Sequence, residues 1–593
     1  MTFAVAVVLI LSATGVWAAG AEEGSEAATD KEMVLDPATG RMLTAPEYGG
    51  TLTWPTTVFP PSPDNWWNLG WAMHFISGVS EKMTHINWAV SRDIWDGTQS
   101  DRPEVSKGNL AESWSMPDDL TFIWNIRQGV HWHDKEPMNG RQLDAHDIVW
   151  NYHRYLGMGD FTEDGPNAAV SAITMGVDIE SVTATDDWTV EIKLAKPGYD
   201  VLGKMLRNYY YVHAPEQVEK YGDAKDWKTL VGTGPLMLVD YVEGSSATWE
   251  KNPNYWGFDE KFPDNRLPYI DTYRALLMPD MSTRLAALRT AKVDIMSNTG
   301  DAAIYSIDDL ETLQRTNPEI EVWSLYRGPD GIFLFNHAMS PTDDVLVRKA
   351  LQMAVDRETI SETYFRGHGR PAPYGLLLQS QTGSAWPYEE WPEDVKREYE
   401  YRPEDAEALL DEAGYPRGAD GIRFKVKLAL HDRFEPTHPE LIIGYFEAIG
   451  VAGELVMQTT AESGARNRAE TAEWELLSGG YGNFLRQNII DSVCQNLNDF
   501  SYTKAQCTRL KELHDAAMAS IELEELQSII READEITVRE HFGLVKSISP
   551  RFSVNQPWVQ SFSGESSMGL GERNSFFARL WIDSELKEAS TGN

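Results

Sequence analysis

The chain has 593 residues, of which 42% are hydrophobic and 24% charged, and 91 Asp and Glu against 52 Lys and Arg give a formal net charge of −39. This length and composition fit a large soluble globular protein with sizeable cores. So acidic a surface repels phosphate backbones and anionic lipid, which excludes the nucleic-acid-binding proteins and predicts no nucleic-acid partner.

The N-terminus has the pattern of a secretion signal. An apolar run over residues 3–11 is followed by the small residues Val16 and Ala18, so we expect cleavage near Ala18 and a mature start at Ala19. No Lys or Arg precedes the run, so the usual positive start is missing, and a buried N-terminal strand is the alternative. The run is too short for a stable bilayer span, and nothing after it resembles one. We therefore expect a secreted, periplasmic protein whose residues 19–48 form a flexible leader rich in Ala, Glu, Gly and Thr.

Strand-like and helix-like segments alternate along the rest of the chain. Apolar residues at helical spacing predict helices, and alternation of apolar and polar residues predicts strands. Around the helix expected over 441–449 the order is strand, helix, strand, which indicates an α/β lobe. Strands are expected over 49–54, 119–126, 182–194 (as a pair), 424–430 and 452–458, and helices over 144–156, 280–292, 344–357, 403–413 and 441–449.

Two early stretches carry recognisable motifs. In the second of them, Gly232, Gly234 and the proline after Gly234 suit a turn in which the backbone needs special dihedral angles. The first stretch joins Asn109-Leu110-Ala111-Glu112-Ser113-Trp114, Arg127-Gln128-Gly129-Val130-His131-Trp132-His133-Asp134 and Asp144-Ala145-His146-Asp147, and the second joins Gly232-Thr233-Gly234-Pro235-Leu236 to Asn252-Pro253-Asn254-Tyr255-Trp256.

Two later stretches complete a pattern that resembles a known family. One joins Phe335-Asn336 to Asp344-Val345-Leu346-Val347-Arg348 and Ala354-Val355-Asp356-Arg357, and the other runs from Arg402-Pro403-Glu404-Asp405-Ala406 to Glu412-Ala413-Gly414-Tyr415. Four motifs in this order, within a similarity running from about residue 49 to about residue 579, resemble the extracellular solute-binding proteins of ABC importers, peptide/nickel type, family 5. Most of these residues suit scaffold roles, and we expect Arg348 to anchor carboxylates or carbonyls.

The resemblance implies an α/β fold of the two-lobed periplasmic binding protein type II, in its large three-domain variant. Hinge strands are implied near 319–324 and 541–549. The implied division is a signal peptide (1–18), a leader (19–48), domain I in three parts (49–92, 229–320 and 546–593), domain II as an insertion in lobe I (93–228), and domain III as lobe II (321–545).

The same resemblance places several loops near the ligand. Aromatic side chains there can stack on sugars or pack on peptide side chains, and amides can bond hydroxyls. Peptide-binding members of the family often carry a Trp followed by an Asp-Pro, whose Asp pairs with the amino group of the peptide. The matching region here is 477–484, and no Asp-Pro follows it. The candidate ligand-binding residues are Trp66, Trp67, Phe335, Asn336, Tyr481 and Asn483.

The sequence offers little support for catalysis or for a metal site. His131, His133 and Asp134, with His146 and Asp147 downstream, suggest metal ligands. The family has similar residues there without a metal, so we expect structural roles, no metal and no cofactor. Acidic pairs are numerous but none stands out, and no nucleophile elbow, P-loop or Rossmann fingerprint occurs, so we expect no catalytic residue.

The predicted function is capture of an oligopeptide or similar solute for an ABC permease in the inner membrane, by a protein that is a monomer. An oligosaccharide-binding importer protein on the same fold is the alternative. A secreted hydrolase that keeps the fold, and a receptor or chemosensory adaptor that uses the same cleft, are further alternatives from other classes.

The two cysteines predict a disulfide. Cys494 and Cys507 are the only ones in the chain, and the N-terminal pattern predicts export, so we expect a bridge that contributes about 3 kcal/mol by closing a short loop. Mass spectrometry of the unreduced, alkylated protein should find no modified cysteine. Two alkylated thiols would contradict the bridge.

Overall fold

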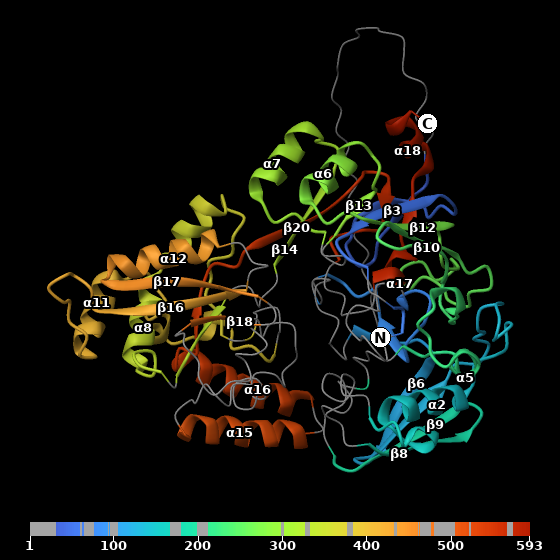
Figure 1. Cartoon of the computed structure of the whole chain (residues 1–593), viewed down its shortest axis with the longest axis horizontal. Helices are drawn as coiled ribbons and strands as arrows, with labels where there is room; N and C mark the ends of the chain where they lie inside the picture. The colour runs from blue at the N-terminus through green and yellow to red at the C-terminus, as the bar shows by residue number, and fades with distance from the viewer. Residues whose placement is uncertain are drawn as a thin grey trace, which may run out of the picture.

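The computed structural model describes residues 31–59, 62–64, 76–92, 94, 105–166, 179–197, 205, 211–297, 302–326, 332–337, 339–375, 377, 383–431, 436–459, 462, 476–479, 504–520, 523–565 and 573–592. Figure 1 shows two lobes joined by a connecting region at the top of the view. We call residues 31–277 and 556–592 lobe I, residues 332–545 lobe II, and residues 278–326 and 550–555 the connecting region.

Lobe I is built around two four-stranded sheets. One has the order β10-β11-β12-β3, with β12 and β3 parallel, and the other has the antiparallel order β6-β7-β9-β8. Trp54 of β3 stacks on Trp249 of β11 at 5.7 Å between ring centroids and meets Phe577 of α17 at 5.1 Å, so aromatic rings join distant segments into one core. The main elements are β3 (Thr51–Thr56), β4 (Thr84–Ile86), β5 (Ser106–Gly108), β6 (Ala111–Asp118), β7 (Thr121–Ile126), α2 (Ala145–Leu156), β8 (Ile179–Asp186), β9 (Thr189–Leu194), α5 (Pro215–Tyr221), β10 (Leu236–Val242), β11 (Ser246–Lys251), β12 (Thr272–Leu277), β21 (Val559–Gln560), α17 (Arg573–Phe577), β22 (Trp581–Ile582) and α18 (Ser584–Thr591).

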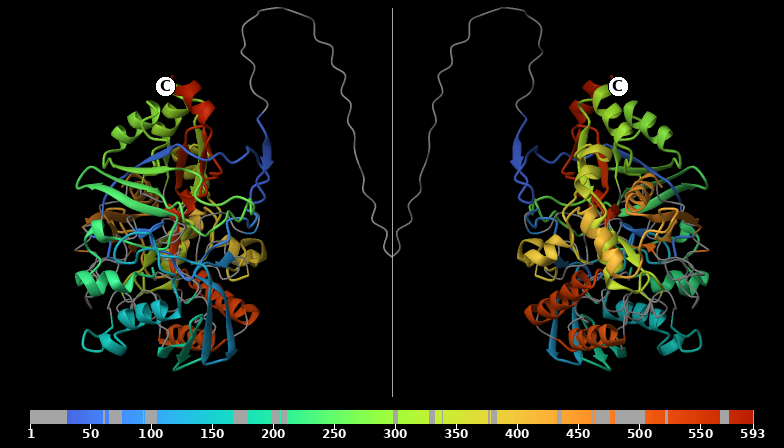
Figure 2. Two further views of the ribbon diagram at one scale, coloured as in Figure 1. Left: turned by 90° about the vertical axis from the view of Figure 1, so that its right-hand side faces the viewer. Right: turned by 90° about the vertical axis from the view of Figure 1, so that its left-hand side faces the viewer.

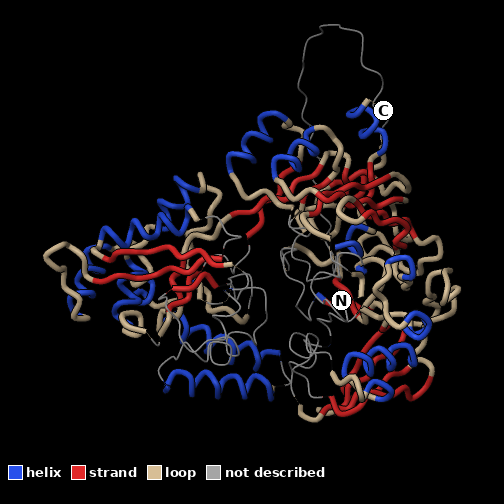
Figure 3. The backbone as a smooth tube through the Cα atoms, viewed as in Figure 1, coloured by secondary structure: helices blue, strands red, loops and turns tan. Residues whose placement is uncertain are grey.

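Lobe II contains one five-stranded mixed sheet of order β17-β16-β18-β15-β19. β16 is parallel to β17 and β18, whereas β15 is antiparallel to both of its neighbours. Figure 3 shows the strands of this lobe in red between blue helices. The elements are β15 (Ile332–Phe335), α8 (Val345–Met353), α9 (Arg357–Thr359), α10 (Glu393–Arg397), α11 (Pro403–Glu412), β16 (Phe424–His431), α12 (Thr437–Ala448), β17 (Val451–Gln458), β18 (Leu476–Gly479), α15 (Lys504–Ala519), α16 (Leu523–Arg539) and β19 (Gly543–Val545).

The connecting region is a three-stranded antiparallel sheet of order β13-β20-β14 flanked by two helices. Its elements are α6 (Met281–Arg289), β13 (Ile295–Met296), α7 (Ile307–Thr316), β14 (Glu321–Tyr326) and β20 (Pro550–Asn555). Among the described elements the chain enters lobe II between β14 and β15 and leaves it between β19 and β20. The hinge strands expected near 319–324 and 541–549 correspond to β14 and to the segment that leads into β20.

One apolar core unites the connecting region with lobe II. Leu288 of α6, Leu310 of α7 and Phe552 of β20 belong to the same buried cluster as Leu351 of α8 and Leu428 of β16. Lobe I has a separate cluster that contains both of its sheets. The lobe I cluster also contains Ile295 of β13, so the connecting region packs against both lobes.

The N-terminal leader expected over residues 19–48 is wrong for its second half. Strands β1 (Met33–Leu35) and β2 (Met42–Thr44) form an antiparallel hairpin, which Figure 2 shows in blue at the edge of the molecule. Lys261 donates to Asp36 at 3.0 Å in a buried ion pair, and Lys31 pairs with Asp583 at 2.6 Å. These partners lie more than two hundred residues away in sequence, so local composition could not indicate the order.

The other predicted elements are largely confirmed, including the β16-α12-β17 unit. The helix expected over 344–357 ends at Met353, because the Asp356 side chain accepts a hydrogen bond from the Thr359 amide at 2.9 Å and starts a new turn. The helix expected over 441–449 begins earlier, at Thr437, since proline is tolerated in a first turn. Its expected end at Gly450 has the left-handed φ of 84°.

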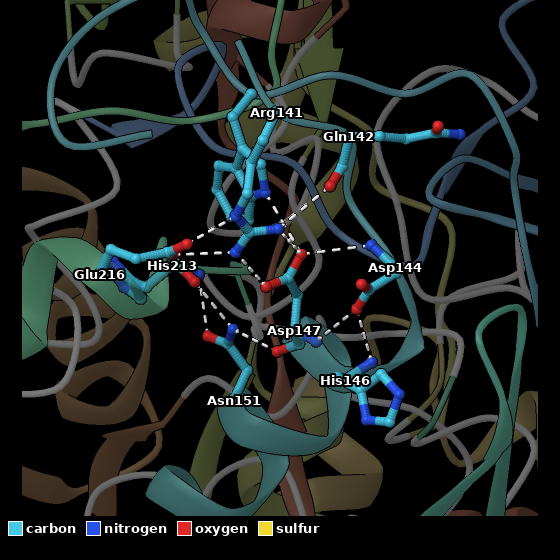
Figure 4. A network of polar contacts seen from close by, with 9 residues as sticks. Arg141, Gln142, Asp144, His146, Asp147, Asn151, His213 and Glu216 are labelled. Carbon is cyan, nitrogen blue, oxygen red and sulfur yellow. Dashed lines mark hydrogen bonds and ion pairs between the residues drawn. The ribbon is translucent and has the colours of Figure 1, made fainter. Parts of the chain in front are cut away.

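An ionic network fixes α2 in lobe I (Figure 4). Arg141 donates to both carboxylate oxygens of Asp147, at 2.6 and 2.8 Å, and to both of Glu216 on α5, at 2.6 and 2.8 Å. Asp147 also completes a capping box with Asp144 at the start of α2. Asn151 exchanges hydrogen bonds with the backbone of His213, at 2.8 Å each, so the helix is tied to a segment far along the chain.

We predict that Asp147→Asn lowers the free energy of unfolding by about 2–3 kcal/mol, because it removes a buried charge-assisted bidentate partner from Arg141. Denaturant unfolding followed by circular dichroism measures the change. Asp160→Asn, at an exposed carboxylate in the short 3-10 helix Gly159–Phe161, is the control and should change stability by no more than about 0.5 kcal/mol. Equal stability of the two variants would contradict the structural role.

Candidate functional site

The candidate site lies at the carboxyl edge of the lobe II sheet, where the parallel strands β16, β17 and β18 end at His431, Gln458 and Gly479. Ile332, the first residue of β15, pairs with Gly479 and with Val545 at the end of β19, so both crossovers between lobes meet this edge. In Figure 1 the edge faces lobe I. In α/β sheets, ligands bind outside the carboxyl ends of the strands.

Lys546 stands at this edge, directly after β19. Its side chain is 6% exposed, and its Nζ lies 4.6 Å from the ring centroid of Phe333 on β15. Within the described ranges, the ammonium has neither a hydrogen bond nor an ion pair. Burial lowers the pKa of Lys546 to about 8, and no carboxylate of the described residues opposes that shift.

His438 lies in the first turn of α12, next to the same edge. It is 5% exposed, and neither ring nitrogen has a hydrogen-bond partner in the described part of the molecule. Its ring meets Phe365 edge-on at 5.1 Å between centroids. Burial and then the charge of Lys546 hold the pKa of His438 well below its ordinary value, so the imidazole is neutral.

The sequence-predicted ligand residues have different outcomes. Phe335 and Asn336, 1% and 2% exposed, lie at the other end of β15, where Phe335 belongs to the apolar core and Thr342 donates to the Asn336 carbonyl at 2.6 Å. Packing accounts for these two positions. The other four ligand candidates lie outside the described residues, so their roles stay predictions: Trp66, Trp67, Tyr481 and Asn483. The disulfide also stays a prediction, because Cys494 and the side chain of Cys507 lie outside the described part of the chain. Lys546 and His438 were missed, because a lone Lys and a lone His carry no motif.

The special dihedral angles expected at Gly232 and Gly234 are wrong, since neither residue has a positive φ. Close backbone packing explains both glycines: a Cβ on either one would collide with the carbonyl oxygens of Gly78 or Val79. The Gly234 amide donates to the Val79 carbonyl at 2.8 Å, so this contact is part of the lobe I backbone network.

The His133 side chain is hydrogen-bonded to the backbone of the segment from Gly232 to Gly234. The Gly232 amide donates to His133 Nδ1 at 3.3 Å, which requires Nε2 to carry the proton and donate to the Gly234 carbonyl at 2.9 Å. Burial lowers the pKa of His133 to about 4, so the ring remains neutral. Both nitrogens are occupied, and among the described residues no three His, Cys, Asp or Glu side chains converge as metal ligands.

The Asn-Pro-Asn-Tyr-Trp motif also serves the scaffold. Tyr255 Oη and Trp256 Nε1 donate to the buried Glu81 carboxylate at 2.9 and 3.1 Å. Burial raises the pKa of Glu81 despite these bonds. Arg348 anchors carbonyls as expected: its guanidinium donates to the Thr342 carbonyl at 2.9 Å and the Glu540 carbonyl at 3.0 Å.

A small pocket of about 330 Å³, including its open mouth, lies within lobe I beside Glu81. Its charged groups are matched: Arg579 donates to Glu260 at 2.6 and 2.7 Å, and His85 Nδ1 accepts from Arg579 at 3.2 Å. Arg579 and His85 of this wall are therefore held by protein groups, whereas the Ser80 hydroxyl has no hydrogen-bond partner among the described residues. None of the helices in the described ranges combines the length and apolar character that a membrane crossing requires.

Comparisons with known proteins agree with this architecture. The model of the bacterial extracellular solute-binding proteins, family 5 Middle, matches residues 106–492. Heme-binding protein A of Haemophilus influenzae is 29% identical over 388 residues, which cover 63% of this chain and 65% of that protein. The dipeptide-binding protein of Escherichia coli is 28% identical over 395 residues, 64% of this chain and 68% of that protein. The alignments thus span about two thirds of these relatives.

Solved structures share the fold. The periplasmic binding protein DppA from Helicobacter pylori, in complex with the peptide STSA, aligns with a TM-score of 0.64 at 19% identity and covers 91% of this chain and 99% of that one. NikA from Brucella suis, in complex with Fe(III)-EDTA, aligns with a TM-score of 0.68 at 19% identity, covering 90% and 100%. The predicted two-lobed α/β fold is confirmed.

We predict that Gly234→Ala lowers the free energy of unfolding by about 3 kcal/mol, because the added methyl group would displace the backbone at Gly78 and Val79. The matched control is Gly444→Ala in the middle of α12, where a Cβ meets nothing within 4 Å. That variant should gain about 0.5–1 kcal/mol from helix propensity. Denaturant midpoints compare the two, and shifts of the same sign would contradict the packing argument.

Proposed function

The chain belongs to the bacterial extracellular solute-binding proteins of family 5, and from this membership we propose that it captures an oligopeptide or similar solute between its lobes and presents it to an ABC permease in the inner membrane. The observation that carries the proposal is the family match together with the two-lobed fold joined by a hinge sheet. Ligand that bridges both lobes stabilises a closed state, and a permease can recognise that state.

The names of relatives favour a peptide. Proteins named for binding dipeptides, di/tripeptides, glutathione and oligopeptides are 23–28% identical to this chain. A second solute, heme, is supported by the relative of Haemophilus influenzae named for binding it. None of these relatives is named for binding an oligosaccharide, so that alternative has the weaker support.

Binding without turnover is part of the proposal. The polar groups that the sequence offers as catalytic or metal-binding candidates, His133 and Asp147, are occupied by backbone and ionic contacts of the scaffold. The periplasm, a monomeric state, signal cleavage near Ala18 and the domain division given above belong to the same proposal, because they accompany the solute-capture role.

A thermal-shift screen tests this function. The purified protein, unfolded and refolded to remove bound ligand, is assayed with di- to hexapeptides, hemin, Ni²⁺ with histidine, and maltooligosaccharides. A ligand at 100 times its dissociation constant stabilises the native state by about 2.7 kcal/mol, which for a chain of this size raises Tm by about 2 °C. We expect this shift with peptides but not with the same amino acids in free form.

Other results would change the assignment. A shift with oligosaccharides alone would establish the alternative, and a shift with hemin alone would replace the peptide by heme. Hydrolysis products of a bound peptide in the mass spectrum would contradict a purely binding role. No shift with any class would overturn the proposal.

A further inference from the structure

The crossover between β19 and β20 carries a buried cation that has no counterion among the described residues. Lys546 is 6% exposed, yet within the described ranges its only polar or charged contact is the cation–π contact with Phe333. An ammonium removed from water costs several kcal/mol unless an anion compensates it. Two other buried cations have such partners, Lys261 with Asp36 and Arg579 with Glu260, and the buried Arg284 and Arg357 donate to backbone carbonyls instead.

The backbone around Lys546 is held on both sides. The Gln352 side chain of α8 accepts from the Val545 amide at 2.9 Å and donates to its carbonyl at 3.3 Å. Two residues after Lys546, Ile548 exchanges hydrogen bonds with Arg370 at 2.9 and 3.2 Å. The lysine is therefore a fixed feature of the crossover, which suits a binding residue that must be in place before the ligand arrives.

A second unpartnered group lies next to it. His438 is 5% exposed, the charge of Lys546 lowers its pKa, and both of its ring nitrogens are without partners in the described structure. It stands in the first turn of α12, whose N-terminus has no side-chain cap and carries the positive end of the helix dipole. Glu440, the acid of that turn, is exposed. Three features thus favour an anion: one ammonium, one neutral imidazole N–H donor and one helix N-terminus.

The number of positive charges at this edge favours an anion with one negative charge. A single ammonium with a neutral donor balances one negative charge, whereas a phosphate dianion needs several charged or amide donors. We infer that Lys546, assisted by His438, binds a carboxylate of the captured solute at the carboxyl edge of the lobe II sheet. This inference rests on the proposed function, and the carboxylate is either a peptide C-terminus or a propionate of heme.

The test compares each ligand with a form whose carboxylate is blocked. Calorimetry measures the dissociation constants of trialanine and trialanine amide, and of hemin and its dimethyl ester. We expect the wild-type protein to bind one free acid at least about 10-fold more tightly than its blocked form, the scale of a charge-assisted hydrogen bond. Lys546→Met should reduce that ratio to about 1, and Lys546→Arg should retain most of it. Lys292→Met, at an exposed lysine of the connecting region, is the matched control and should leave the ratio unchanged.

Each outcome decides a different question. Equal affinity of the wild-type protein for acid and blocked forms overturns the carboxylate site while leaving solute capture intact. Discrimination that survives in Lys546→Met, with the fold intact by circular dichroism, assigns the carboxylate to another residue and overturns the role of Lys546. If neither peptides nor hemin bind the wild-type protein in any form, the proposed function fails and the carboxylate site with it.

Discussion

The antiparallel ladder between β14 and β20 is the constraint on which the two-lobed architecture depends. It pairs Glu321 with Asn555 at one end and Tyr326 with Pro550 at the other, so the two crossovers into lobe II start side by side. Side chains reinforce the ladder: Trp323 donates to Asn555 Oδ1 at 2.8 Å. Because paired strands resist sliding, the lobes can change their relative position chiefly by rotation about the adjacent crossovers.

The motifs that identify the family mostly build lobe I. His133 spans the Gly232–Gly234 turn, Glu81 receives the Tyr255 hydroxyl, and Asp147 joins the capping of α2 to Arg141. Each contact links segments about a hundred or more residues apart or closes a helix end, so each tolerates few substitutes whatever the solute is. Ligand residues can vary among proteins that bind different solutes. This explains why the family can be recognised from the sequence more easily than the ligand.

The sequence predicted the fold class, the β16-α12-β17 unit and most helix ends, because these depend on local periodicity and caps such as Asp144 and Gly450. It failed where distant partners decide the structure. Residues 31–48 are ordered by Lys261 and Asp583, and Gly234 is required by the carbonyls of Gly78 and Val79 rather than by its own dihedral angles. Phe335 was chosen as a strand-end aromatic, but β15 runs antiparallel to β18, which puts that end at the opposite edge.

The position of Lys546 in the crossover gives it a role that a residue on either lobe could not have. A buried charge that no described residue compensates raises the free energy of the arrangement around the crossover, and an anionic solute removes that cost where the lobes are joined. Binding energy is then gained beside the rotation axis, where small movements of the crossover become large movements of the lobes. A carboxylate at Lys546 would therefore couple occupancy to closure directly, because ligand shifts the conformational equilibrium only by its different affinities for the open and closed states.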